Sequence, residues 1–322
     1  MNDDAPLLEV EDLRVYFSIN GRDAKAVDGV SLSVREGATL GLAGESGSGK
    51  SVTALAILRL VPPPGRFVSG SIRYRGRSLL DLEPAEMRQV RGREIGLVFQ
   101  EPLSAVNPLF TIGQQIVETK RVQAGLSARE ARTEARELLR IVGIPSPERH
   151  LSSYPHELSG GMRQRAMTAL ALAAGPRLLI ADEPTTALDV TIQAQVLAQL
   201  KRIQEELGMG ILFITHDLAL LAGTADEIAV MYAGRIVERA PVRPFLQTPL
   251  HPYSKDLLKS VDGAVGGGRY WTIPGSIPDP ADHPAGCPYH PRCSETFGRC
   301  RDEDPATLDL GEGRAVRCWL HS

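Results

Sequence analysis

A short run from Gly44 to Ser51 combines glycines with a lysine and a serine at the spacing of a nucleotide phosphate loop. The glycines let backbone N–H groups close around phosphate oxygens, and a helix that opens at Lys50 points its positive end at them. Lys50 would hold the β- and γ-phosphates, and Ser51 would hold Mg²⁺. We therefore predict a site for ATP and Mg²⁺ formed by Gly44, Ser46, Gly47, Ser48, Gly49, Lys50, Ser51 and Val52.

The flanking sequence supplies the elements that such a loop requires. Residues 38–43 are apolar and strand-like, and residues 52–60 favour a helix that stops before Pro62-Pro63-Pro64. Strand, loop and helix thus follow in the order typical of this motif. We expect the loop to be held between a buried strand and the start of a helix.

A second chemical feature is the pair Asp182-Glu183, which ends an apolar run that begins at Leu178. In phosphate-loop proteins an aspartate at this place orders the Mg²⁺ shell, and an adjacent carboxylate polarises the water that attacks the γ-phosphorus. Taken alone, Asp-Glu-Pro after a strand indicates only a polar turn. Together with the phosphate loop, it predicts the first role for Asp182 and the catalytic role for Glu183.

Between these two features, Ser159-Gly160-Gly161 forms a turn into a helix that we expect to continue to Leu172. Exposed N–H groups at a helix start, together with a serine hydroxyl, can bind phosphate. Because the chain already has a phosphate loop for its own nucleotide, we expect the ligand here to be the ATP of another molecule. With this motif the sequence resembles the ABC-transporter ATPases, in which the motif of one subunit closes over the γ-phosphate held by the opposite subunit.

The resemblance extends to further residues that follow in the order of the family. It implies that Gln100 senses Mg²⁺ and the attacking water, that Asp189 spans the dimer interface, and that His216 contacts the γ-phosphate. It also implies that Phe17, in preference to Tyr16, stacks on adenine. Singly, a histidine after a strand or an aromatic residue near an N-terminal strand indicates only structure, but their joint order favours the family roles.

The composition is that of an ordinary soluble protein with a sizeable core. The chain has 322 residues, of which 43% are hydrophobic and 23% are charged, and its net charge is −3. Near-neutral charge argues against nucleic acid as the main partner without excluding it. No apolar stretch reaches the roughly 18 residues that a spanning helix needs, and the acidic start lacks the basic end of a signal peptide. We therefore expect a cytosolic chain.

The periodicity of apolar residues predicts an α/β fold with a helical subdomain. A strand-rich N-terminal part leads into the nucleotide core, and a helical insertion follows Gln100. In that insertion Ser127 and Glu130 have capping-box spacing at the start of an amphipathic helix. A further helix, from Thr191 to the stop at Gly208, is predicted to place one apolar face in the core: Ile192, Val196, Leu200, Ile203 and Leu207.

Three regions follow from these elements and from the resemblance. Residues 1–250 are assigned to an ABC-type ATPase domain with an N-terminal antiparallel β subdomain. Its helical subdomain is expected at about residues 101–165, and residues 251–322 are assigned to a small C-terminal extension that contains all the cysteines.

Several segments indicate a branch of the family. Residues 101–110 look like the surface that meets a permease, and Tyr154–Glu157 stands where exporters carry a glycine-glutamate element, so the chain resembles an importer subunit. Residues 248–254, Ile273-Pro274-Gly275 and the cysteines that follow resemble the tail of ATPase subunits of bacterial dipeptide/oligopeptide and nickel permeases. The resemblance covers nearly the whole chain, apart from its first few residues and the linker 263–268.

The cysteines indicate a metal centre in the tail, because disulfides are rare in a reducing compartment. Their spacing lacks the close pairs of zinc knuckles, which favours an iron–sulfur cluster over zinc, and the resemblance favours [4Fe-4S]. Zinc and four unmetallated thiols stay open as alternatives, and His283 and His290 are either substitute ligands or polar surface. We expect the cluster to fold the tail, with these ligands: Cys287, Cys293, Cys300 and Cys318.

The resemblance implies that the chain hydrolyses ATP to power import of di- and oligopeptides. Two ATP molecules would lie between this chain and a paralogous ATPase subunit. The chain would be a peripheral subunit at the cytoplasmic face of the inner membrane. Its complex would also contain two transmembrane permease subunits and an extracellular solute-binding protein. The alternatives are a nickel or glutathione-type importer, a soluble ABC ATPase that acts on DNA or ribosomes, and a non-catalytic regulatory subunit. The long insertions or second cassette of the soluble members are missing, and intact Lys50, Asp182, Glu183 and His216 speak against a regulatory subunit.

Overall fold

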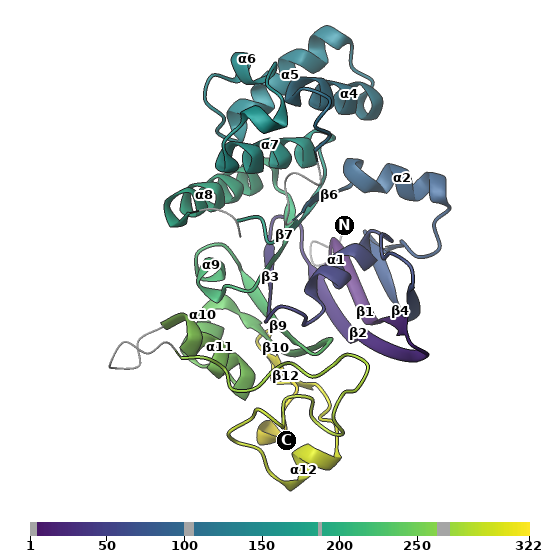
Figure 1. The fold of residues 1–322 in the computed structure, drawn as a ribbon, viewed down its shortest axis with the longest axis vertical. Helices are drawn as coiled ribbons and strands as arrows, with labels where there is room; N and C mark the ends of the chain where they lie inside the picture. Colours follow the sequence, from purple (N-terminus) through teal and green to yellow (C-terminus); the bar gives the residue numbers. More distant parts are fainter. Residues whose placement is uncertain (1–4, 100–105, 186–188, 263–270) are drawn as a thin grey trace. The chain divides into compact units, whose positions relative to one another are not determined.

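The computed structural model describes residues 5–99, 106–185, 189–262 and 271–322 (Figure 1). The chain groups into two units. The first contains residues 1–34, 39–81 and 213–322, and the second contains residues 35–38 and 82–212. The first unit therefore joins the start of the chain to its end and includes residues on both sides of position 250.

The first unit is built on two groups of strands. One is an antiparallel sheet with the order β2-β1-β4-β5, which confirms the predicted antiparallel part at the N-terminus. The other has the order β11-β12-β10-β9-β3, in which β3 pairs parallel to β9 and the remaining pairs are antiparallel. The strands are β1 Leu8–Ile19, β2 Arg22–Val34, β3 Thr39–Ala43, β4 Gly65–Tyr74, β5 Arg77–Ser78, β9 Glu227–Tyr232, β10 Arg235–Pro241, β11 Leu308–Asp309 and β12 Ala315–Val316.

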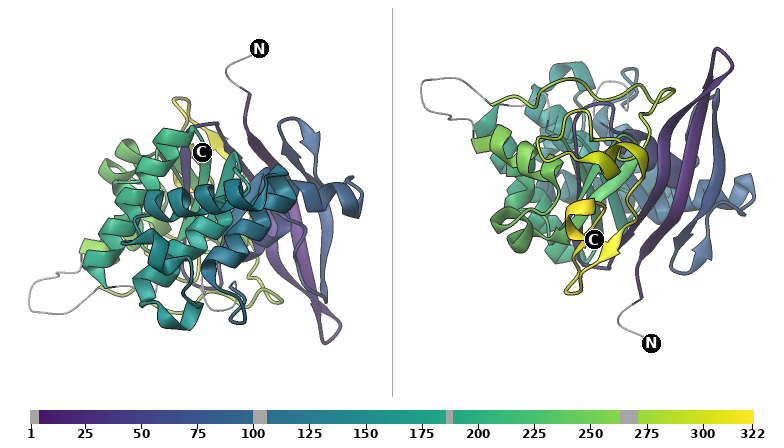
Figure 2. Two further views of the ribbon diagram at one scale, coloured as in Figure 1. Left: turned by 90° about the horizontal axis from the view of Figure 1, so that it is seen from above. Right: turned by 90° about the horizontal axis from the view of Figure 1, so that it is seen from below.

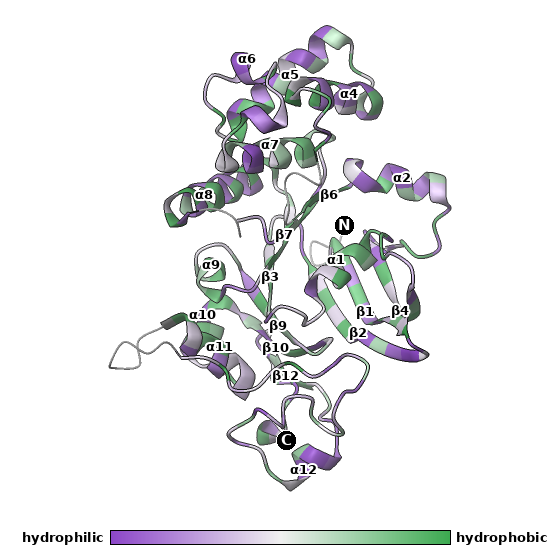
Figure 3. Ribbon diagram, viewed as in Figure 1, coloured by the Kyte–Doolittle hydropathy of each residue, from purple (hydrophilic) through white to green (hydrophobic). Residues whose placement is uncertain are grey.

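Helices complete the first unit, and Figure 3 shows α1 mainly in the hydrophobic colour. They are α1 Lys50–Ile57, α9 Leu218–Ala222, α10 Val242–Gln247, α11 Pro252–Asp262, α12 Gly298–Asp302 and η2 Trp319–His321. The strands differ in how many of their residues are buried. Along β2 buried and more exposed positions alternate over much of the strand, whereas β3 is buried at every position, as is typical of a strand covered on both faces.

The second unit contains the expected helical region. The helices α4, α5 and α7 pack on one another, and β6 pairs parallel to β7. Its elements are α2 Pro84–Arg93, β6 Ile95–Val98, α4 Ile112–Ala124, α5 Ala128–Ile141, α6 Pro147–His150, η1 Pro155–Glu157, α7 Gly160–Leu172, β7 Leu178–Asp182 and α8 Val190–Leu207. The strand β8 (Gly210–Thr215) then carries the chain into the first unit. Among the elements described in both units, no helix is long and apolar enough to cross a membrane.

Local hydrogen bonds explain where the helices of the second unit begin and end. Ser127 accepts from the backbone N–H of Glu130, whose carboxylate accepts from the Ser127 N–H, so the predicted capping box is confirmed. The helix α8 ends at Gly208, as predicted. Val196, Leu200 and Ile203 are buried on its core face, but Leu207 is 45% exposed and its assignment to the core is wrong. Leu207 lies in the last turn of α8, where Gln204 takes the buried position and donates from its side-chain amide to the Gly37 carbonyl at 2.6 Å.

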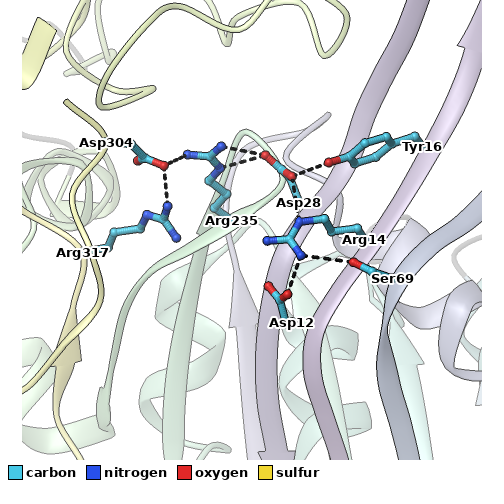
Figure 4. Close-up of polar contacts among 8 residues, drawn as sticks. All are labelled: Asp12, Arg14, Tyr16, Asp28, Ser69, Arg235, Asp304 and Arg317. Atoms are coloured by element: carbon cyan, nitrogen blue, oxygen red, sulfur yellow. Dashed lines mark hydrogen bonds and ion pairs between the residues drawn. The ribbon is translucent and has the colours of Figure 1, made fainter. Parts of the chain in front are cut away.

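A chain of ion pairs fastens the tail inside the first unit (Figure 4). The buried Asp28 of β2 accepts from the Tyr16 hydroxyl at 2.7 Å and from Arg235 of β10 at 2.7 Å. Arg235 also pairs with Asp304 of the tail, and Arg317 donates to the same carboxylate at 2.6 Å. Burial alone would raise the pKa of Asp28, but the hydrogen bonds from Tyr16 and Arg235 hold it below its ordinary value.

Further backbone contacts bind the tail, drawn in yellow-green to yellow in Figure 2 (right), to the same unit. The N–H of Lys25 in β2 donates to the Pro280 carbonyl at 2.8 Å, and the N–H of Arg317 donates to Val237 of β10 at 2.9 Å. The tail is thus a packed part of the unit that carries the phosphate loop.

The ion pairs predict a pH-dependent contribution to stability. Arg235→Met should lower the free energy of unfolding at pH 7 by about 3 kcal/mol, because Asp28 would stay buried with only Arg14, whose Nε lies 3.5 Å from its carboxylate, as a cation. The folded pKa of Asp28 is lowered, so its contribution is present above the unfolded value of about 3.9 and is lost as the pH falls through the folded value. The gap between parent and variant should therefore shrink in acid, which urea unfolding at several pH values measures.

A matched control is Arg66→Met, which breaks the exposed Arg66–Asp23 pair of the same unit. Its effect should stay within about 1 kcal/mol. Equal losses for the two variants, or a gap independent of pH, would contradict the stabilising role of the Asp28 network.

Candidate functional site

The phosphate loop lies in the first unit, between the buried strand β3 and the helix α1, which begins at Lys50 as predicted. Its glycines are required by close backbone contacts. A Cβ at Gly44 would lie 2.2 Å from the Met231 carbonyl oxygen of β9, and a Cβ at Gly49 would lie 2.2 Å from that of Ala26 in β2. Gly49 also has φ +106°, which L-residues rarely adopt. The two strands therefore set the path of the loop.

The side chain of Lys50 turns back into this loop. Lys50 is 5% exposed, and its Nζ donates to the carbonyl oxygens of Gly44 at 2.7 Å and Glu45 at 2.9 Å. Ser46, Gly47 and Ser51 are exposed along the same segment. The loop thus presents a buried ammonium group together with accessible backbone, which is the combination that binds an anionic phosphate chain.

The carboxylates lie in the second unit at the end of β7. Residues Leu178 to Ala181 are buried, so the strand brings Asp182 and Glu183 to its C-terminal end, where both are half-buried. Glu183 has φ +47°, in the left-handed region that is uncommon for residues other than glycine. Such strain at a carboxylate is typical of functional positions.

The Ser-Gly-Gly motif begins α7 in the second unit, as predicted. Ser159 is the N-cap residue, and its Oγ accepts from the Met162 N–H at 3.4 Å. An open pocket of about 520 Å³ is lined by Ser159, Gly160, Gly161, Arg165 and Asp189, among others. Asp189 caps α8 by accepting from the N–H groups of Thr191 and Ile192 at 3.1 and 3.0 Å. The structure thus brings the motif and Asp189 together at one pocket.

The remaining predicted residues are placed as follows. His216 is exposed directly after β8, in the same unit as the phosphate loop. Phe17 of β1 is half-buried and is paired with Gly65 of β4, whereas the neighbouring Tyr16 is engaged by Asp28. Burial and this hydrogen bond raise the pKa of Tyr16 to about 12. Gln100 lies outside the described residues, as do residues 101–105 and 186–188.

The four cysteines converge in the tail without forming disulfides. Burial, and to a smaller extent charge repulsion from the thiols of Cys318, Cys300 and Cys293, raises the pKa of Cys287 to about 11. Backbone N–H groups of the residues two positions later donate to the sulfurs of Cys287, Cys293 and Cys318. Within the described part of the chain, no group of three or more His, Cys, Asp or Glu side chains is arranged to hold a metal ion.

Two residues that contact the phosphate loop were not predicted from the sequence. Tyr253 and Arg292 bind Glu45 inside the loop, and a third unpredicted residue, Tyr232, packs beside both of them. Arg292 is 247 residues away from Glu45 along the chain. Only the conspicuous Pro252-Tyr253 in the tail pointed to this region, and no spacing rule connects it with a loop so distant in sequence.

The chain is similar to known transporter proteins along nearly all of its length. The family model of the ABC transporter matches residues 27–186, and that of the oligopeptide/dipeptide transporter C-terminal region matches residues 237–300. A relative in Sinorhizobium fredii, named as a peptide ABC transporter ATP-binding protein, is 46% identical over 97% of this chain and 94% of its own. A relative in Brucella abortus, named as a peptide import ATP-binding protein, is 48% identical over 98% of this chain and 95% of its own.

Solved structures confirm the fold. The dimeric structure of MJ0796, a bacterial ABC transporter cassette, has a TM-score of 0.66 and 27% identity, and the match covers 73% of this chain and 99% of that one. The structure of cbiO1 from Clostridium perfringens, part of an ABC transporter complex, also has a TM-score of 0.66, with 25% identity over 76% of this chain and 92% of that one. The predicted α/β fold of an ABC-type ATPase is correct, and the chain belongs to the family of ATP-binding subunits of peptide ABC transporters.

Proposed function

We propose that this chain hydrolyses ATP to power the import of di- or oligopeptides through a separate transmembrane permease. The observation that carries the proposal is the union, in one chain, of an ATPase cassette with a tail that matches the oligopeptide/dipeptide transporter model at residues 237–300. The names of its relatives as peptide import ATP-binding proteins support the substrate class. A nickel or glutathione-type importer is the alternative, because substrate choice belongs to the partner subunits.

The residues of the nucleotide site have distinct proposed roles. Lys50 and the N–H groups of the loop hold the phosphates, while Ser51, Asp182 and Gln100 serve Mg²⁺. Glu183 polarises the attacking water, and His216 contacts the γ-phosphate. Phe17 stacks on adenine. The neighbouring Tyr16 is held in place by the hydrogen bond from its hydroxyl to Asp28, so we assign the stacking role to Phe17. The buried ammonium group of Lys50 and the strained backbone of Glu183 support the first and third of these roles.

The Ser159-Gly160-Gly161 motif acts on the nucleotide of a second ATPase subunit. Its residues are accessible at an open pocket, and Ser159 caps a helix whose N-terminal end attracts anions. We infer that the partner is a paralogous ATPase, so that two ATP molecules lie between two different chains. Asp189, at the same pocket, faces this interface.

The permease is expected to dock on the helical region of the second unit. An open pocket of about 630 Å³ there is lined by Asn107, Phe110, Gln115, Glu118 and Val122, among others. Phe110 and Val122, which line it, are 47% and 73% exposed and Leu109 is 78% exposed, so apolar side chains gather on this face, as they do at sites of protein contact. We place the chain as a peripheral subunit at the cytoplasmic face of the inner membrane, with two permease subunits and an extracellular solute-binding protein.

Replacing the catalytic carboxylate tests the function directly. In proteoliposomes that contain the whole transporter, a peptide-loaded binding protein should stimulate ATP hydrolysis and peptide uptake. Glu183→Gln should keep ATP binding and lower turnover by roughly 10²-fold or more, the usual scale for losing a positioned base. The control Glu205→Gln, at an exposed position of α8, should behave as the parent.

Hydrolysis at the parental rate in Glu183→Gln would remove Glu183 from the catalytic role. Stimulation by nickel or glutathione instead of peptides would overturn the substrate class while leaving the ATPase in place.

Blocking the Ser-Gly-Gly turn tests its action on the partner's nucleotide. Ser159→Arg should impair hydrolysis at the site whose phosphate loop lies in the partner and leave nucleotide affinity at Lys50 nearly intact. The control Ser152→Arg adds the same charge at another exposed position of this unit. Nucleotide titrations of the separate subunit and turnover of the assembled pair measure the two effects, and a collapse of binding in the folded, separate subunit would refute action in trans.

We further propose that Cys287, Cys293, Cys300 and Cys318 hold a [4Fe-4S] cluster. The donor set fits this group in its chemistry, because the four cysteines carry free thiols and three of the sulfurs accept backbone N–H groups, as thiolates around clusters do. The four thiolates of a [4Fe-4S] cluster each bind a different iron atom, so they stand farther apart than the ligands of one metal ion. The proposal therefore does not require side chains arranged around a single ion. When bound, it would supply four covalent links that staple a tail with little regular structure.

Metal analysis tests the proposed cluster. Protein purified without oxygen should be brown and carry about four iron atoms per chain, and it should lose its colour when any one of the four cysteines becomes serine. ATP hydrolysis should change far less, because the cysteines are no part of the proposed phosphate chemistry. Stoichiometric zinc without iron rejects the cluster, and the absence of any metal supports four free thiols.

A further inference from the structure

Three buried tyrosines form a cluster behind the phosphate loop. Tyr232 comes from β9, Tyr253 from α11 and Tyr289 from the tail, and each is at most 1% exposed. Their ring centroids lie 4.6 to 5.2 Å apart in tilted or edge-on arrangements. Such packing is rigid, because aromatic rings in contact have little freedom to move independently.

Arg292 of the tail projects from this cluster to the loop. Its side chain is 4% exposed, and its guanidinium group lies 5.8 and 5.9 Å from the ring centroids of Tyr232 and Tyr289. It donates to both carboxylate oxygens of Glu45, at 2.8 and 3.0 Å. Its Nε donates to the Pro274 carbonyl at 2.7 Å, which fixes the orientation of the group. A bidentate pair of this kind is both strong and specific in geometry.

The backbone of Glu45 is held as well. Its N–H donates to the Tyr253 hydroxyl at 2.8 Å, and its carbonyl oxygen accepts from Lys50 Nζ at 2.9 Å. Glu45 is therefore fixed through its side chain, its N–H and its carbonyl. All of these partners belong to the same unit, and two of them, Tyr253 and Arg292, come from residues beyond position 250.

We propose that Arg292 and Tyr253 are positioning residues, which hold the phosphate loop ready for the triphosphate from the side of the tail. This inference rests on the proposed binding of ATP at Lys50. A loop rich in glycine and serine loses much conformational freedom when it closes on phosphates, and fixing Glu45 beforehand reduces that loss. Arg292 has a second effect, since it neutralises a carboxylate that stands inside a loop for an anionic ligand.

The experiment measures the dissociation constant of Mg²⁺ and a non-hydrolysable ATP analogue on the full chain by calorimetry. Arg292→Met should weaken binding about tenfold, because the loop is released and the Glu45 charge is exposed to the phosphates. Arg292→Lys, which keeps the charge, should restore part of the affinity. Glu45→Gln placed in the Arg292→Met chain should recover only part of it, since the uncompensated charge is removed while the loop stays released. Arg299→Met is the matched control, as Arg299 is an exposed arginine of the same tail.

A purely structural role for Arg292 has a different signature. It would lower the unfolding temperature and the metal content of the tail, and Glu45→Gln would not rescue ATP affinity. Tyr253→Phe keeps the ring and removes only the hydroxyl acceptor, so it tests the same loop contact where Arg292→Met fails to fold, and it should weaken binding about threefold.

Affinities of Arg292→Met and Tyr253→Phe within about twofold of the parent would overturn the proposal, as would a loss that Glu45→Gln does not rescue. Lys50→Ala separates this failure from failure of the proposed function. If the parent binds the analogue and Lys50→Ala does not, the nucleotide site stands whatever the Arg292 variants show. If the parent itself does not bind, the proposed function fails first.

Discussion

The close approach of two backbone carbonyls to the phosphate loop is the constraint on which the nucleotide site depends. The carbonyl of Met231 in β9 and that of Ala26 in β2 come so near to Gly44 and Gly49 that no side chain fits at either position. The loop is therefore shaped by strands that are themselves packed in the core, and Lys50 is buried as a consequence. The shape of the phosphate loop thus depends on the packing of the whole first unit.

Each unit carries a different part of the proposed chemistry. The first holds the loop that binds phosphates, with His216 and Phe17, and the second holds the carboxylates and the Ser-Gly-Gly motif. The second unit also contains helices with exposed apolar residues beside an open pocket, which is where a partner would act on it. In an ATPase that drives transport, ATP binding and hydrolysis must act on another subunit, and the exposed helical region of the second unit would offer the surface for that contact.

The tail is integrated with the first unit by polar contacts as well as by its buried Tyr289, which packs on Tyr232 and Tyr253. Asp304 and Arg317 connect it to Asp28 through Arg235, and Arg292 connects it to the loop. Because buried charges are tolerated only when they are paired, these contacts also define one arrangement of the tail. The proposed cluster of the cysteines would hold the same segment, since Cys287 and Cys293 flank Tyr289 and Arg292 in the sequence.

Local sequence alone determined the elements that carry the predicted site. Glycine spacing before Lys50, the apolar run that ends at Asp182 and the capping box at Ser127 act within a few residues, so they can be recognised without knowledge of the fold. The family resemblance then supplied the roles of residues that have no local signature, such as His216 and Asp189. The exposed Leu207 shows the limit of periodicity, which predicts a helical face but not where the core ends along it.

Only the tertiary structure decided which distant residues meet. Glu45 and Arg292 are 247 positions apart; the spacing of the phosphate loop leaves the residue type at Glu45 open, and Arg292 belongs to no recognisable pattern. The same holds for Arg235 and Asp28, and for the tyrosines that surround Arg292. Buried ion pairs between remote segments depend on how strands are ordered in a sheet and on where the tail returns, and this information is spread over the whole chain. The sequence determined the phosphate chemistry because it is local, and the fold decided what holds that chemistry in place because such contacts are not.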